Sequence, residues 1–251
     1  MKEFLEGWKD PSQVYSNTNS PLLFKAKQLQ KFLILLFYTS LPPSRGMKIR
    51  TLQQGTTLQF RSSTNTWWLI LDQFKTKKNK GIDSIELNPQ TQDILITYLE
   101  LFISKYRQLL LESWWKKEKE TNLMITKTQA MKDDGYLFVA SSNCKEQCYT
   151  ESAWSIMMCQ IFKEKTGMNV TINILRSAFI TYFYGSEDSQ NLNLRESVAS
   201  GMRHSIQEAQ RTYDRRYFPL SFGFCLFFCA SLFKYKNQSR KKEKSCRLVR
   251  E

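Results

Sequence analysis

The chain of 251 residues is poor in the side chains that usually hold metal ions. It contains one His, and none of its six Cys forms a CxxC pair. A structural zinc site needs four ligands at short spacing, so we expect no such site. The cysteines are instead expected to be buried or free thiols in a reducing compartment.

The sequence also lacks an apolar run of full membrane-spanning length. Residues 217–233 are strongly apolar and carry no charge, but they fall short of the about 20 residues that a spanning helix needs. Three interpretations of this run stay open: a tail packed on the body or on a neighbouring subunit, sequence foreign to the domain, or, less favoured, a membrane anchor. The first ten residues, MKEFLEGWKD, do not have the basic and then apolar layout of a signal peptide.

Acidic residues are scarce relative to basic ones. The 23 Asp and Glu face 37 Lys and Arg, which gives a formal net charge of +14. Residues 234–251 hold eight Lys or Arg and two Asp or Glu, a net +6, so the rest of the chain carries 14 − 6 = +8. A body this basic predicts a polyanionic partner, either nucleic acid or an anionic membrane surface. Hydrophobic residues, at 41%, are frequent enough for a packed core, which excludes a wholly disordered chain.

The pattern of apolar residues predicts an α+β fold, mainly α, with one small three-stranded antiparallel sheet. We expect a polar lead-in at 1–21, one domain at 22–216 and an apolar, then basic, tail at 217–251. The elements expected within the domain are helices at 22–40, 44–54, 91–120, 151–166, 170–184, 192–202 and 205–213, strands at 57–60, 67–74 and 82–87, and a short extended segment at 136–139.

Four short segments carry residues that suggest chemistry. They are LPPSRG at 41–46, FKTKKNKG at 74–81, NILRSAF at 173–179 and MRHS at 202–205, with Tyr213 downstream. Taken singly, each has a plainer interpretation, such as a solvated turn, a snorkelling arginine or a packing tyrosine. Their joint occurrence in one order favours a functional interpretation.

This order resembles the catalytic domain of the tyrosine recombinase, or phage integrase, family. The similarity is greatest to the divergent forms of Crypton-type mobile elements and large DNA viruses, in which the first Arg follows a Pro-Pro pair and a Lys lies in a KT-rich β-turn. It covers roughly residues 30–215, and its strongest part is MRHS with Tyr213, because the interval 213 − 204 = 9 is the one expected in the family.

The resemblance implies site-specific DNA strand cleavage and rejoining through a 3′-phosphotyrosine intermediate. No metal ion or other cofactor is implied, since the phosphotyrosine bond keeps the energy of the phosphodiester and basic side chains stabilise the charge. The implied partner is double-stranded DNA, with self-association on it as a dimer or tetramer and no small-molecule substrate. The implied location is intracellular, in the nucleus if the host is eukaryotic.

The resemblance also gives roles to individual residues. Arg45 and Arg176 would clamp the non-bridging phosphate oxygens with paired hydrogen bonds. His204 would donate to a phosphate oxygen or assist proton transfer, and Tyr213 would attack phosphorus. Lys75 would protonate the departing 5′-oxygen. An alternative for this last role is Lys77.

Two positions depart from the family pattern. Asn173 stands where the best-known members have a His, and Asn cannot accept a proton for transfer. Lys48 stands three residues after Arg45, where many relatives carry an acidic residue. The usual N-terminal DNA-clamping domain is also expected to be missing. Two other interpretations therefore remain: a catalytically inactive DNA-binding remnant of a mobile element and, less favoured, a membrane-tethered basic protein.

Overall fold

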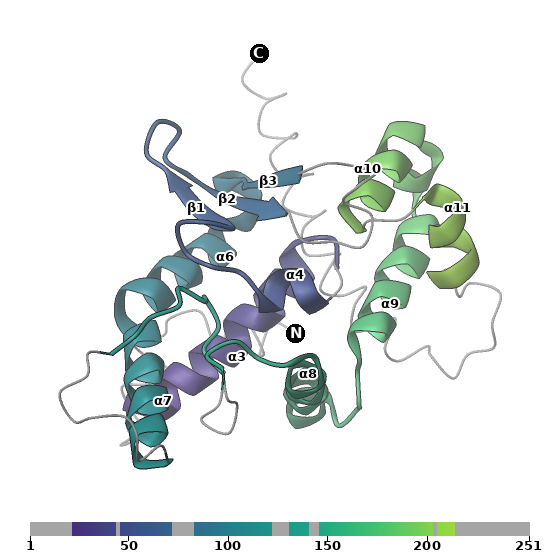
Figure 1. The fold of residues 1–251 in the computed structure, drawn as a ribbon. Helices are drawn as coiled ribbons and strands as arrows, with labels where there is room; N and C mark the ends of the chain where they lie inside the picture. Colours follow the sequence, from purple (N-terminus) through teal and green to yellow (C-terminus); the bar gives the residue numbers. More distant parts are fainter. Residues whose placement is uncertain are drawn as a thin grey trace, which may run out of the picture.

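The structure is a computed structural model that describes residues 22–43, 46–71, 83–121, 131–140, 146–202 and 205–213. It confirms the expected fold class, α+β and mainly α, with helices packed around a central helix and a small antiparallel sheet (Figure 1). Arg45, Lys75, Lys77 and His204 lie outside the described residues, as do the lead-in and the tail. Of Tyr213 only the backbone is described.

Helix α3 (Leu22–Ser40) is the centre of the core, as its apolar sequence predicts. Its residues 32–38 are all buried, and a helix that is apolar on all sides is expected to be enclosed in this way. Helices α6 (Pro89–Leu101) and α7 (Arg107–Thr121) pack against it. The prolines that follow Leu41 end α3, because proline has no N–H to donate and its ring clashes with the preceding turn.

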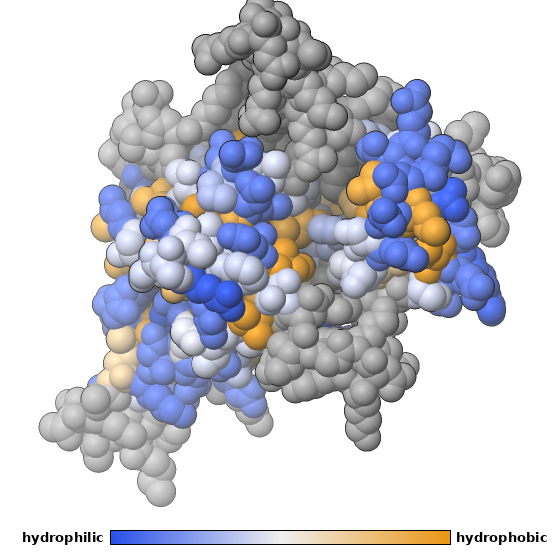
Figure 2. All heavy atoms as spheres, turned by 90° about the horizontal axis from the view of Figure 1, so that it is seen from above, coloured by the Kyte–Doolittle hydropathy of each residue, from blue (hydrophilic) through white to orange (hydrophobic). Residues whose placement is uncertain are grey.

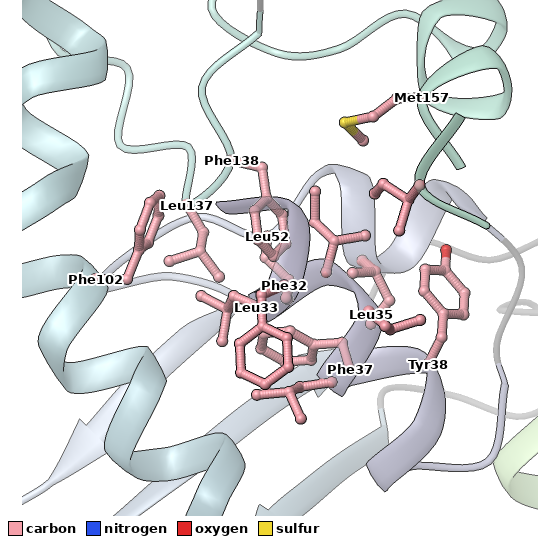
Figure 3. Packing of buried hydrophobic residues seen from close by; sticks show 14 of the residues in the cluster. Phe32, Leu33, Leu35, Phe37, Tyr38, Leu52, Phe102, Leu137, Phe138 and Met157 are labelled. Carbon is pink, nitrogen blue, oxygen red and sulfur yellow. The ribbon is translucent and has the colours of Figure 1, made fainter. Parts of the chain in front are cut away.

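Aromatic side chains fill the core beside α3 (Figure 3). The ring of Phe138 lies 5.8 Å from that of Phe37, 6.5 Å from that of Phe102 and 5.5 Å from that of Trp154, measured between centroids. These partners come from α3, from the helical turn after α6 and from α8 (Glu151–Thr166). Phe138 therefore connects three separate elements.

The sheet has three strands: β1 (Leu58–Arg61), β2 (Thr66–Leu71) and β3 (Asp83–Leu87). They are antiparallel in the order β1-β2-β3, as predicted. Leu58 pairs with Leu69, and Leu69 pairs with Ile85, so these side chains share one face of the sheet. That face packs on the core, where Leu58 and Leu69 are each 1% exposed.

The helix predicted over 44–54 is wrong in its second half. Helix α4 covers only Gly46–Arg50. Beyond it, Gln53 forms an antiparallel bridge with Tyr136. The hydroxyl of Thr57 accepts a hydrogen bond from the backbone N–H of Gln53 at 2.7 Å. Side chain to backbone bonds of this kind compete with helical hydrogen bonds, and here they favour a turn into β1.

The long helix predicted over 91–120 is confirmed with a local change. It begins at Pro89, because the Asn88 side chain accepts a hydrogen bond from the N–H of Gln90 at 2.8 Å and caps the helix. Between α6 and α7 the helix widens into a π-helical turn, η1 (Phe102–Tyr106). Trp114 of α7 is 6% exposed, as expected for a packing residue.

The remaining helices lie where the sequence predicts them. They are α8, α9 (Ile172–Tyr184), α10 (Leu192–Met202) and α11 (Ile206–Glu208), which continues as the π-helical turn η3 (Ala209–Tyr213). Gly167 ends α8 with a φ of 74°, a left-handed conformation that suits glycine. The side chain of Thr171 accepts a hydrogen bond from the N–H of Ile174 at 3.3 Å and begins α9. The short 3-10 turn η2 (Glu187–Gln190) was not predicted.

Buried side chains form two clusters that meet at α9. The first includes Leu175 and Ala178 from α9, together with α3, the sheet and α6 to α8. The second is small and lies among α9, α10 and α11, which stand as a group beside the body in Figure 1. Its members are Ile180, Phe183, Tyr184, Met202 and Ala209. Helix α9 therefore belongs to both packing units.

The surface of this helical group is part hydrophilic and part apolar (Figure 2). In the first turn of α10, Leu192 is 59% exposed and Leu194 is 41% exposed. At its other end, Ala199 and Met202 are buried. The first turn of α10 is therefore largely exposed, and its last turn packs into the fold through Ala199 and Met202. None of the helices within the described ranges is long and apolar enough to cross a membrane.

An arginine–carboxylate pair fixes the segment 131–140 to α7. The guanidinium of Arg107 donates to both carboxylate oxygens of Asp133, at 2.7 and 2.6 Å, and to the carbonyl of Tyr136 at 2.8 Å. The N–H of Gly135 donates to Asp133 at 2.7 Å. The hydrogen bonds from Arg107 lower the pKa of Asp133 below its ordinary value, and partial burial opposes them.

We expect acid to remove the stabilisation that Asp133 provides. Its pKa is lower in the folded chain than in the unfolded one, so its contribution is present above the unfolded pKa of about 4 and is lost as the pH falls below that value through the lowered pKa of the folded chain. Asp133→Asn should therefore lower the free energy of unfolding at pH 7 and differ less from wild type near pH 3. Urea unfolding at both pH values measures this.

A matched control for this experiment is Glu196→Gln, at an exposed position of α10. Its unfolding curve should follow that of the wild type at both pH values. A difference between Asp133→Asn and wild type that grows as the pH falls would contradict the expected sign.

Candidate functional site

Arg176 joins two of the segments that the sequence singles out. It lies on α9 and is 0% exposed. Its Nη1 donates to the carbonyl oxygen of Pro43 at 2.7 Å, and its Nη2 donates to that of Met202 at 3.2 Å. Pro43 stands two residues before Arg45, and Met202 stands two residues before His204. One guanidinium therefore holds the chain at the entry to both segments.

The Pro-Pro segment also lies close to the end of α10, where the side chain of Pro42 faces the backbone of Gly201. A Cβ built on Gly201 would lie 3.3 Å from Cγ and 3.4 Å from Cβ of Pro42. Because such short contacts are rare, glycine at this place allows the Pro-Pro segment to lie directly against the end of α10. This contact was not predicted from the sequence. The available signal was a glycine inside a helical pattern beside MRHS, since such glycines often mark close packing.

The local sequence also explains how the chain reaches Tyr213. The hydroxyl of Ser205 accepts a hydrogen bond from the N–H of Glu208 at 3.1 Å, in the S-x-x-E pattern that begins helices. The helical segment continues through η3 to Tyr213. η3 packs against α9, with Ala209 1% exposed in the second cluster. The backbone of Tyr213 thus belongs to the same helical group as Arg176.

Tyr38, at the end of α3, is another tyrosine near enough to Arg176 to be affected by its charge. It is 1% exposed, and its oxygen accepts a hydrogen bond from Nε1 of Trp154 at 3.2 Å. Burial raises the pKa of Tyr38 well above its ordinary value, against the opposing effects of Trp154 and of the positive charges of Arg176 and Arg50. Tyr38 is therefore a protonated, enclosed phenol and a poor nucleophile.

The other residues near the predicted site differ in their surroundings. Asn173 is exposed on α9, although Arg176 is fully buried one helical turn later. Lys48, on α4, is 7% exposed. Arg45, Lys75 with its alternative Lys77, and His204 are outside the described residues. What comes together is therefore α9, the Pro-Pro segment, the end of α10 and the backbone leading to Tyr213.

Metal ligands and thiols do not form a cluster in the part of the chain that the structure describes. Within the described ranges, no group of three or more His, Cys, Asp or Glu side chains could hold a metal ion. Cys148 and Cys159 are free thiols, the former buried. The site described above therefore consists of a buried guanidinium and main-chain carbonyls.

Comparison with known proteins gave no match to the chain among family models, curated proteins or solved structures. The interpretation of the site thus depends on its sequence segments and on the geometry around Arg176.

Proposed function

We propose that this chain cleaves and rejoins DNA strands at specific sites, as a tyrosine recombinase does, with Tyr213 as the nucleophile. The observation that supports this proposal most strongly is the contact of Arg176 with the carbonyls of Pro43 and Met202. The LPPSRG and MRHS segments lie far apart in the sequence, yet a main-chain carbonyl oxygen of each accepts a hydrogen bond from this one guanidinium. A phosphate site shared by α9, LPPSRG and MRHS requires these three segments to meet. Segments with separate structural roles would not need to meet at one residue.

The proposed reaction exchanges one phosphate ester for another. The Tyr213 oxygen attacks phosphorus, the bond from phosphorus to the 5′-oxygen breaks, and a 3′-phosphotyrosine forms. Arg45 holds the non-bridging oxygens, and His204 donates to one of them or assists the transfer of the tyrosine proton. Lys75, or alternatively Lys77, gives a proton to the departing 5′-oxygen. The reverse reaction with a new 5′-hydroxyl rejoins the strand.

The direct test uses a nicked suicide duplex, from which the cleaved fragment diffuses away and traps the intermediate. The wild-type chain should give a covalent protein–DNA adduct on a denaturing gel, and the yield should be the same with excess EDTA. An adduct that needs magnesium would contradict the proposed mechanism. Tight DNA binding without any adduct would instead identify the alternative, a catalytically inactive DNA-binding remnant.

Binding to duplex DNA should depend steeply on salt. The body carries +8 and the tail +6, and each phosphate that a basic group neutralises releases counterions. With about six phosphate contacts, affinity should fall on the order of 10³-fold between 50 and 200 mM salt. Fluorescence anisotropy with a labelled duplex measures the slope, and an affinity that hardly changes with salt would refute the electrostatic interpretation.

A variant whose tail carries +2 in place of +6 separates the two contributions to this slope. Replacing Arg240, Lys241, Lys242 and Lys244 by Gln removes four positive charges. The slope should become shallower but stay substantial, because the body remains basic.

The proposed activity also sets the expected assembly and location. Strand exchange joins two duplexes, so we expect dimers or tetramers to form on DNA. DNA as the substrate implies an intracellular site of action, in the nucleus if the host is eukaryotic.

A further inference from the structure

We propose that Arg176 is a positioning residue that holds the main chain on either side of the reaction site, and that it does not itself clamp the phosphate. This inference rests on the proposed function and deepens it. It gives Arg176 a different role from the phosphate contact that the resemblance implies, and it leaves that contact to Arg45.

The hydrogen bonds of Arg176 are the first reason. A guanidinium presents its donors in a rigid planar fork. Both terminal nitrogens already donate to main-chain carbonyls, Nη1 to Pro43 at 2.7 Å and Nη2 to Met202 at 3.2 Å, and the residue is 0% exposed. Each terminal nitrogen keeps a second N–H, but the side chain is fully enclosed, so a phosphate could reach these donors only if the chain around Arg176 moved away.

The division of the core is the second reason. Leu41, beside the Pro-Pro segment, belongs to the first cluster, whereas Met202 belongs to the second. The segments that carry Arg45 and His204 are therefore anchored in different packing units. Arg176 connects them by its two hydrogen bonds, and the contact of Pro42 with Gly201 keeps them close.

The chemistry is sensitive to this connection. In-line attack on phosphorus requires the tyrosine, the basic groups and the phosphate at set distances, and a displacement of about 1 Å can cost on the order of 10²-fold in rate. A residue that fixes the separation of two catalytic segments thus affects the rate without touching the substrate.

The test compares the rate of adduct formation on two suicide duplexes, one normal and one with a methylphosphonate at the cleavage site. The methyl group replaces a non-bridging oxygen and removes the negative charge that a clamping arginine neutralises. Arg45→Ala, the control for a phosphate contact, should be slow on the normal duplex and regain rate on the neutral one. Arg176→Ala should be slower than wild type on both, by about 10²-fold.

Recovery of Arg176→Ala on the methylphosphonate duplex, to the extent seen for Arg45→Ala, would overturn the proposal.

Gly201→Ala provides a second test, because its methyl group pushes on Pro42 and leaves the guanidinium unchanged. It should also slow adduct formation on both duplexes, by about 10-fold or more. Ser200→Ala, at the exposed neighbouring position, should leave the rate unchanged. If Arg176→Ala does not fold, Gly201→Ala carries the same comparison.

Amide hydrogen exchange supplies a readout that does not depend on DNA. Arg176→Ala and Gly201→Ala should both speed exchange in α4 and in the last turn of α10, while α3 keeps its protection. If the wild type formed no adduct, the proposed function would fail, and this measurement would still decide the positioning role. Unchanged exchange in both segments would overturn it.

Discussion

Replacing Tyr213 by Phe should abolish the covalent protein–DNA adduct, whereas replacing Tyr217 by Phe should leave it intact. Tyr213 is nine residues after His204, and Tyr217 is thirteen residues after it. The helical segment that Ser205 begins carries the backbone to Tyr213 and packs on α9, the helix that also carries Arg176. The Phe variant lacks only the attacking oxygen, so we expect a loss of at least about 10³-fold in adduct yield, in line with removal of a nucleophile.

The environment of Tyr213 must also promote its reactivity. A phenol has a pKa of about 10 and is a weak nucleophile at neutral pH. Nearby positive charge favours the phenolate and the transition state, and a fixed position near phosphorus avoids the entropy of encounter. Tyr38 shows the opposite case, because burial raises its pKa and encloses its oxygen.

The control for this experiment is DNA binding by the variant. Tyr213→Phe should bind duplex DNA with the affinity and salt dependence of the wild type, because one hydroxyl is lost and no charge. An adduct that persists in Tyr213→Phe and disappears in Tyr217→Phe would show that the nucleophile lies four residues further along the chain. Loss of the adduct in both variants would show that neither tyrosine acts independently of the other.

Much of the fold could be predicted from the sequence because the signals are local. The apolar run of α3, the apolar and aromatic residues of β1 and β2, and the capping residues Thr150 and Thr171 each act over a few neighbours. The error at 51–54 has a different origin. The turn there depends on Tyr136, which is distant in sequence and pairs with Gln53.

The partners of the candidate site residues were not predictable in the same way. The sequence singled out Arg176 from its neighbours and its order in the chain. Its bonds to Pro43 and Met202 join three distant segments, and no periodic pattern encodes them. Gln30 is a comparable case within the core, since its side chain donates to the carbonyl of Val139 at 3.0 Å and accepts from its N–H at 2.9 Å. A buried polar residue on an apolar helix indicates that a partner exists, but not which one.

The largest effect on stability is expected from Phe138→Ala. Phe138 is 0% exposed and contacts aromatic rings from three elements, and removal of such a ring leaves a cavity that costs about 3–5 kcal/mol. That is a large share of the about 5–15 kcal/mol that stabilises a typical domain. Phe138→Leu, which keeps more of the side-chain volume, should lose less of the free energy of unfolding.

Phe60→Ala is the matched control, because Phe60 is 45% exposed on β1, and it should cost about 1 kcal/mol or less. Urea unfolding followed by circular dichroism measures all three changes. Equal losses from Phe138→Ala and Phe60→Ala would show that the aromatic cluster around Phe138 does not stabilise the fold.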